Sequence, residues 1–140
     1  MNIAEVLAQV DALKPNQYDD QMKIAWLSTL DGKIYAEVML THELPLVEQE
    51  TFDETTGEYV FEMVPLEFNG YTEYDMNADL LVKEPYSDIY TNYIFAMIDY
   101  HNQEMDRYNN SMMMFNSRYA YFKAWYNKNH MPLSQSPKLF

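Results

Sequence analysis

The sequence predicts a mainly α protein: a small helical bundle with a long terminal helix, or a kinked helix pair, and an acidic β-hairpin or loop excursion. Apolar residues recur at helical spacing in three segments, about 2–14, 19–40 and 86–129. The segment between them, 41–84, loses this spacing and carries prolines and glycines. A length of 140 residues and a hydrophobic share of 48% fit one domain, 1–140, with a packed core.

The first two helices are marked by residues that cap helix starts. Asn2 is a candidate N-cap, and Glu5 follows three residues later, as in a capping box. Pro15 ends the first helix, and Asp19 or Asp20 caps the second. A helix of about three turns cannot bury its apolar stripe alone, so we expect the first helix to dock on another element.

The excursion 41–84 contains the pattern of a β-hairpin. Two runs suit strands, Leu46–Phe52 and Glu58–Val64, and in the second run residues alternate with roughly the period of a half-buried strand. The residues between them, Asp53–Gly57, favour a turn. We expect Asn69–Asp79 to be a loop.

The segment 86–129 has the most regular apolar spacing. From Tyr90 to Tyr126 these residues follow one another at steps of three or four, close to a heptad seam. The unbroken phase favours one long or kinked helix. The alternative is a break at Asn109–Ser111 that produces a tight antiparallel pair, because Asn tolerates a helix C-cap and Ser can cap a new helix. Beyond it, 131–140 contains two prolines and is expected to be a flexible tail.

Charge is distributed unevenly along the chain, whose formal net charge is −13. From Ile34 to Val82 there are twelve carboxylates and no Lys or Arg, whereas from Arg107 to Phe140 there are five cations and no carboxylate. This asymmetry suggests that identical copies join, with an acidic face against a basic face. The alternative is a solvated acidic loop and an ordinary helix surface. Tyr and Met residues on several faces of the last segment also favour a subunit interface. The candidate interface residues are Glu48, Glu50, Asp53, Glu54, Glu58, Glu62, Arg118, Tyr119, Lys123, Trp125 and Lys128.

Several function classes are excluded by the composition. The absence of Cys removes disulfides, thiolate chemistry and cysteine metal sites, and the negative charge argues against broad binding to a phosphate backbone. His101 and Glu104 lie one helical turn apart without a third ligand, so we predict a polar interruption of the seam and no metal site. A calcium loop starting at Asp53 fails because Gly57 is fifth and Val64 is twelfth. No catalytic or cofactor-binding motif is present, so we expect neither an enzyme nor a cofactor.

Targeting signals are also not expected. The first fifteen residues lack a basic start and a long apolar core, so they do not form a signal peptide. The uncharged stretch 89–98 is far shorter than the roughly 20 residues of a membrane span. We therefore expect no membrane association, and a cytoplasmic location when the protein is made.

Several runs of the chain carry a family resemblance. They are Val10–Asn16, Leu81–Tyr90, Ile98–Tyr100, Glu104–Met112 and Phe115–Tyr126. These runs are similar to small proteins encoded among the capsid genes of tailed phages and prophages of Gram-positive bacteria. By size and helical layout, the chain resembles the head–tail connector or adaptor proteins of the phage neck. The resemblance covers the helical segments and leaves the acidic middle outside.

A structural role in the virion is what this resemblance implies. Connectors of this family are helical bundles with an extended loop or hairpin, and they form a ring, usually twelvefold, beneath the portal. The implied partners are other copies of the chain, the portal protein and the next neck or tail-completion protein, while DNA passes through an acidic lumen without specific binding. The implied location is the virion neck, after assembly in the cytoplasm of the bacterial host.

A rival hypothesis is a regulatory binding module, such as an acidic DNA mimic that inhibits a host protein. Mimics spread carboxylates over a folded surface. Here the carboxylates concentrate in one segment, which favours the connector.

Overall fold

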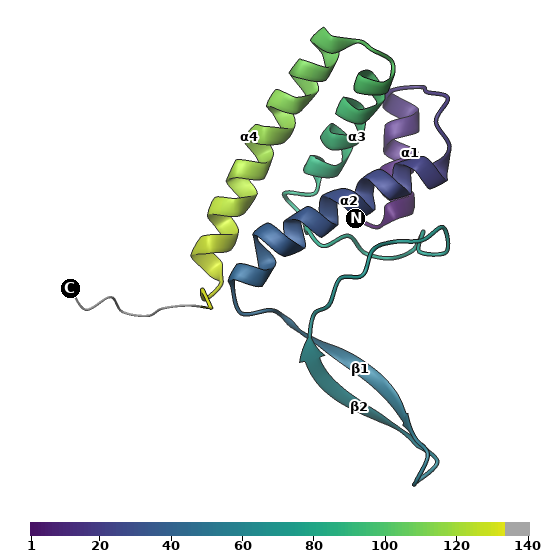
Figure 1. The fold of residues 1–140 in the computed structure, drawn as a ribbon, viewed down its shortest axis with the longest axis vertical. Helices are drawn as coiled ribbons and strands as arrows, with labels where there is room; N and C mark the ends of the chain where they lie inside the picture. The colour runs from purple at the N-terminus through teal and green to yellow at the C-terminus, as the bar shows by residue number, and fades with distance from the viewer. Residues whose placement is uncertain (134–140) are drawn as a thin grey trace, which may run out of the picture.

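A computed structural model describes residues 1–133 of the chain. Helices form one body, and a two-stranded antiparallel sheet extends from it (Figure 1). The mainly α class is therefore confirmed. The tail expected over 131–140 lies, apart from its first three residues, outside the described residues. The helical elements are α1 (Ile3–Leu13), α2 (Asp20–Glu37), the 3-10 turn η1 (Met39–Thr41), α3 (Asp88–His101) and α4 (Met105–Asn129).

The first two helices begin at the residues that the sequence predicts. The Asn2 side chain accepts the backbone N–H of Glu5 at 2.8 Å, and the Asp19 carboxylate accepts that of Met22 at 2.9 Å. Each cap satisfies an N–H group that the first turn of a helix leaves without a partner. α2 ends at Glu37, earlier than predicted, and η1 carries the chain toward the sheet.

The predicted terminal helix is divided into two. A turn at Asn102–Glu104 separates α3 from α4, with Gln103 in the left-handed region at φ 61°. The N–H of Glu104 donates to the carbonyl of Asp99 at 2.9 Å and closes this turn. One uninterrupted helix is therefore wrong, and so is a break at Asn109–Ser111, which lies inside α4.

The apolar spacing predicted one continuous helix, whereas α3 and α4 are two helices that pack antiparallel against each other (Figure 1). Each helix buries one stripe, so the same spacing recurs on both sides of the turn without marking the reversal. The buried stripes consist of Ile89, Tyr90, Ile94 and Ile98 on α3, and of Phe115, Tyr119, Phe122 and Tyr126 on α4.

The core lies where the four helices meet the segment 66–87, which returns from the sheet to α3. Leu80 and Val82 of this segment are fully buried. The carbonyl of Met76 also accepts the N–H of Ala4 at 2.9 Å, which ties the segment to the start of α1. The excursion predicted over 41–84 is therefore two structures: a hairpin that stands apart, and a return segment that completes the core.

The predicted hairpin is confirmed. β1 (Leu46–Asp53) and β2 (Glu58–Pro65) pair antiparallel, in a register that runs from Leu46 opposite Pro65 to Asp53 opposite Glu58. Gly57 has a φ of 71°, which glycine adopts without steric cost, and its N–H donates to the carbonyl of Asp53 at 2.8 Å.

Candidate functional site

The hairpin stands clear of the helical body (Figure 1). β1 and β2 pair with each other, and within residues 1–133 neither strand packs along a helix. Side chains on both faces of the two strands are exposed, and only Asp53 and Val64 are partly covered. A two-stranded hairpin is marginally stable by itself, so an uncovered one is a candidate contact surface.

One face of the hairpin is largely apolar. Alternate residues of paired strands share a face, so Phe61 opposite Glu50 and Met63 opposite Glu48 point to the same side. The rings of Phe52 and Tyr59 meet there with centroids 5.2 Å apart. The apolar side chains on this side are between 54% and 63% exposed. We call this surface the hairpin apolar face: Leu46, Glu48, Glu50, Phe52, Tyr59, Phe61 and Met63.

The structure brings the six predicted acidic interface residues together on the hairpin. Glu48 and Glu50 lie on the hairpin apolar face, and the others lie in the turn or on the opposite face. The backbone N–H of Thr55 donates to Asp53 at 2.9 Å and lowers the pKa of that carboxyl from its ordinary value. No Lys or Arg accompanies the six carboxylates on either strand or in the turn. The six are Glu48, Glu50, Asp53, Glu54, Glu58 and Glu62.

Two of the predicted interface residues on α4 serve the fold. Arg118 places its Nε 2.8 Å from the carboxylate of Asp88 and its guanidinium 5.8 Å from the ring centre of Tyr86, which fastens α4 to the start of α3. Tyr119 is only 5% exposed and its hydroxyl donates to Glu37 at 3.4 Å. Burial raises the pKa of Tyr119 to about 12. Tyr119 is therefore a core residue in the single chain, and the expectation that it faces a neighbour is corrected.

The other predicted residues of α4 are exposed. Trp125 is 42% exposed, and Lys123 and Lys128 lie on the surface, with the Lys123 ammonium 4.7 Å above the Tyr119 ring. Met114 and Tyr121, at 56% and 62% exposed, share the outer side of α4 with Trp125. Steps of three and four residues place these side chains in one row. We call this row the α4 outer stripe: Met114, Ser117, Tyr121, Trp125 and Lys128.

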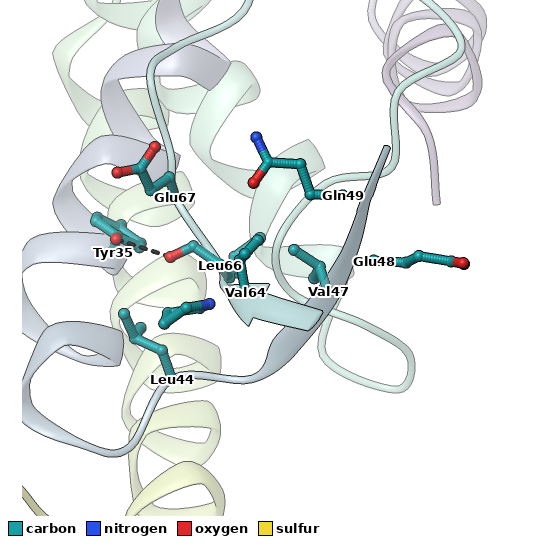
Figure 2. A pocket seen from close by; sticks show the side chains of 9 residues that line it. Tyr35, Leu44, Val47, Glu48, Gln49, Val64, Leu66 and Glu67 are labelled. Atoms are coloured by element: carbon teal, nitrogen blue, oxygen red, sulfur yellow. Dashed lines mark hydrogen bonds between the residues drawn. The ribbon is translucent and has the colours of Figure 1, made fainter. Parts of the chain in front are cut away.

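Two hollows flank the root of the hairpin. The larger, about 500 Å³, is shown in Figure 2, where Val47, Val64 and Leu66 gather near Leu44 while Glu48 points away from them. The hydroxyl of Tyr35 donates to the carbonyl of Leu66 at 2.9 Å and fixes the hairpin to α2. The second hollow, about 390 Å³, is lined largely by apolar and aromatic side chains. It includes Leu80, Leu81, Phe122, Trp125 and Tyr126. Both hollows lie between the root of the hairpin and the helical body.

The predicted seam residues His101 and Glu104 take separate roles. The His101 ring stacks on Trp26 with centroids 5.3 Å apart and planes 11° apart, and Glu104 pairs with Arg107 at 3.2 Å. Among residues 1–133, no group of three or more His, Asp or Glu side chains is arranged to hold a metal ion.

Comparison of the chain with protein-family models, with curated proteins and with solved structures finds no match. Within the part of the chain that the structure describes, no helix is both long enough and apolar enough to cross a membrane.

Sequence reasoning missed a buried polar cluster around Asp31 of α2. Its carboxylate accepts the Tyr90 hydroxyl at 2.6 Å, the Tyr71 hydroxyl and the N–H of Leu81 at 3.1 Å. Burial, opposed by these hydrogen bonds, raises the pKa of Asp31. Burial and the nearby Asp31 charge also raise the pKa of both tyrosines. The cluster fastens the return segment to α2 and α3, and its sequence signal is an aspartate on the apolar face of a helix.

Proposed function

We propose that the chain is a structural protein of the phage neck. In this proposal it is a head–tail connector or adaptor that assembles with copies of itself into a ring below the portal. The single observation that carries the proposal is the uncovered hairpin apolar face, which extends from a packed helical body (Figure 1).

An uncovered surface of this kind favours assembly. Exposed aromatic and aliphatic side chains gain about 1.5–3 kcal/mol each when fully buried. On the hairpin they are gathered on one side of two strands that pack along no helix within residues 1–133. Contiguous exposed apolar surface of this kind marks a protein contact site. The resemblance of the helical segments to neck proteins supplies the setting for that contact.

The charge of the hairpin supports a place near DNA without DNA binding. Its six carboxylates are accompanied by no cation, so they repel a phosphate backbone. In a ring whose hairpins line the lumen, DNA would pass without adhering. The proposed location is the virion neck, and the proposed partners are the portal and the next neck or tail-completion protein.

A closed ring needs two different contact patches on each subunit. The chain offers two that differ in chemistry, the acidic hairpin and α4, which carries four cations and one carboxylate. A DNA mimic would instead present its carboxylates over a folded surface, whereas here six of them lie on a slender hairpin.

Electron microscopy of the purified chain with the portal protein of the same phage or prophage tests the proposal. We expect rings, stacked on the portal where it is present. A monomer or dimer that ignores the portal and instead binds a host protein tightly would contradict the neck function and support the DNA-mimic alternative.

A further inference from the structure

We propose that the hairpin apolar face of one copy docks on the α4 outer stripe of a second copy. This inference rests on the proposed self-assembly and names the two surfaces that meet. Both surfaces combine exposed apolar side chains with charge, and their charges are opposite in sign.

The hairpin apolar face sets aromatic and aliphatic side chains among carboxylates. Phe61 lies across from Glu50, and Met63 lies across from Glu48, so each carboxylate adjoins an apolar side chain that is 58% or 60% exposed. Burying these side chains removes apolar area from water, while the carboxylates require a cation once water is displaced. A suitable partner surface is therefore apolar and carries a cation at its edge.

The α4 outer stripe has that composition. Met114, Tyr121 and Trp125 form its apolar centre and Lys128 continues the row, whereas Lys123, two residues from both Tyr121 and Trp125, lies on another side of α4. Within residues 1–133 Lys128 forms no ion pair, so it is available to a carboxylate of another chain.

The two surfaces also match in length. From Met114 to Lys128 there are fourteen helical steps of about 1.5 Å, which is about 21 Å. From Leu46 to Phe52 there are six strand steps of about 3.4 Å, which is about 20 Å. One hairpin can therefore lie along one stripe with its whole apolar face in contact.

Pairing of the exposed strand edges of two hairpins is the main competing arrangement. It would set six carboxylates of one hairpin beside six of another, with no cation between them. Like charges on adjacent strands are destabilising. Docking on α4 avoids this repulsion and uses two different patches, as ring closure requires.

Disulfide cross-linking tests the docking cleanly because the natural chain has no cysteine. Phe61→Cys carries its thiol at the centre of the hairpin apolar face, and Tyr121→Cys carries it at the centre of the α4 outer stripe. The two single variants, distinguished by tags of different size, are mixed and oxidised mildly at the highest soluble concentration. We expect a mixed disulfide dimer at least tenfold more abundant than in two control mixtures.

Each control moves one thiol to another face of the same element. Thr51→Cys lies on the opposite face of the hairpin, and Asn127→Cys lies on α4 away from the stripe; both positions are exposed. Equal yields from all mixtures, no mixed product, or a predominance of Phe61→Cys homodimers would overturn the docking.

Charge reversal provides a second measurement. Glu48→Lys/Glu50→Lys and Lys128→Glu are each expected to lower the sedimentation coefficient of the assembly without changing the unfolding midpoint. Mixing the two reversed proteins should restore it. Loss in both without restoration by mixing, or no loss in either, would contradict the docking.

The outcomes separate the docking from the proposed function. Rings on the portal without the Phe61–Tyr121 product would overturn the docking and leave the neck function standing. The product without rings or portal binding would support the docking and contradict the neck function. Neither rings nor product would overturn both.

Discussion

Tyr90→Phe removes a single oxygen atom and is expected to destabilise the fold strongly. The Tyr90 side chain is fully buried. Its hydroxyl donates to the Asp31 carboxylate at 2.6 Å and accepts the N–H of Val82 at 2.8 Å. Without the hydroxyl, the buried Val82 N–H loses its acceptor and the carboxylate loses one of its donors.

The magnitude follows from those two losses. A hydrogen bond to a charged group contributes about 1.5–3 kcal/mol, and an unsatisfied buried N–H costs about 1–3 kcal/mol. Their sum is about 2.5–6 kcal/mol, and relaxation around the site moves the result toward the lower end. A loss of about 3 kcal/mol is a large part of the 5–15 kcal/mol that holds a typical domain folded. It lowers the urea midpoint by about 1–3 M.

Equilibrium unfolding in urea, followed by tryptophan fluorescence, measures this change. Tyr126→Phe is the matched control, since Tyr126 is 4% exposed and its hydroxyl has no hydrogen-bond partner within residues 1–133. We expect the control to change the free energy of unfolding by less than about 0.5 kcal/mol, or to raise it. Equal destabilisation by the two variants would refute the reasoning, because it would show that the hydrogen bonds of Tyr90 contribute nothing specific.

Three further predictions concern other parts of the molecule. Burial raises the pKa of Asp31 above its ordinary 3.8, so its stabilising contribution is present at acid pH and lost as pH rises through the raised pKa. The urea midpoint of the natural chain, measured relative to that of Asp31→Asn, should therefore fall from acid to neutral pH. Parallel plots of the two midpoints against pH would contradict this. Arg118→Ala breaks a part-exposed ion pair with Asp88 and should lower the free energy of unfolding in urea by about 1 kcal/mol. The sedimentation of the assembly should not change; loss of the assembly would show that Arg118 belongs to the subunit interface. A protease specific for glutamate should cut the free chain first at Glu54 or Glu58, as mass spectrometry of early fragments would show, and a first cut inside a helix would count against the projecting hairpin.

Local signals in the sequence were sufficient for much of the fold. The caps at Asn2 and Asp19 depend only on residues within one helical turn, and both are present in the structure. The hairpin was predictable for the same reason, because strand alternation and the glycine of its turn are encoded within twenty residues.

The division of the last helix was not predictable from spacing. Two antiparallel helices that bury facing stripes repeat the same period, so periodicity carries no sign of direction. The turn places Gln103 at positive φ, although glutamine is not a residue type that marks such a position. Asn109–Ser111 resembled a helix boundary more closely, yet there the chain continues as helix because α4 packs on α3.

The candidate site was only partly predictable. On α4 the sequence does not separate Tyr119, which is buried, from Trp125, which is exposed, because both are aromatic residues near one seam. Arg118 has its partner, Asp88, on another helix. The Asp31 cluster escaped notice because Tyr71 and Tyr90 are 40 and 59 residues away along the chain.

In the proposed assembly, the hairpin is the arm through which copies of this chain associate. The N–H of Leu66 donates to the carbonyl of Pro45 at 2.9 Å, so residues 46–65 can be replaced by a short Gly-Ser turn that joins two adjacent ends. The most direct measurement is the mass distribution of the intact and hairpin-deleted proteins, each with and without the portal. We expect rings for the intact chain, and a folded monomer with an unchanged helical circular dichroism spectrum for the deletion. Rings of the same size from both proteins, or a monomer from both, would contradict it.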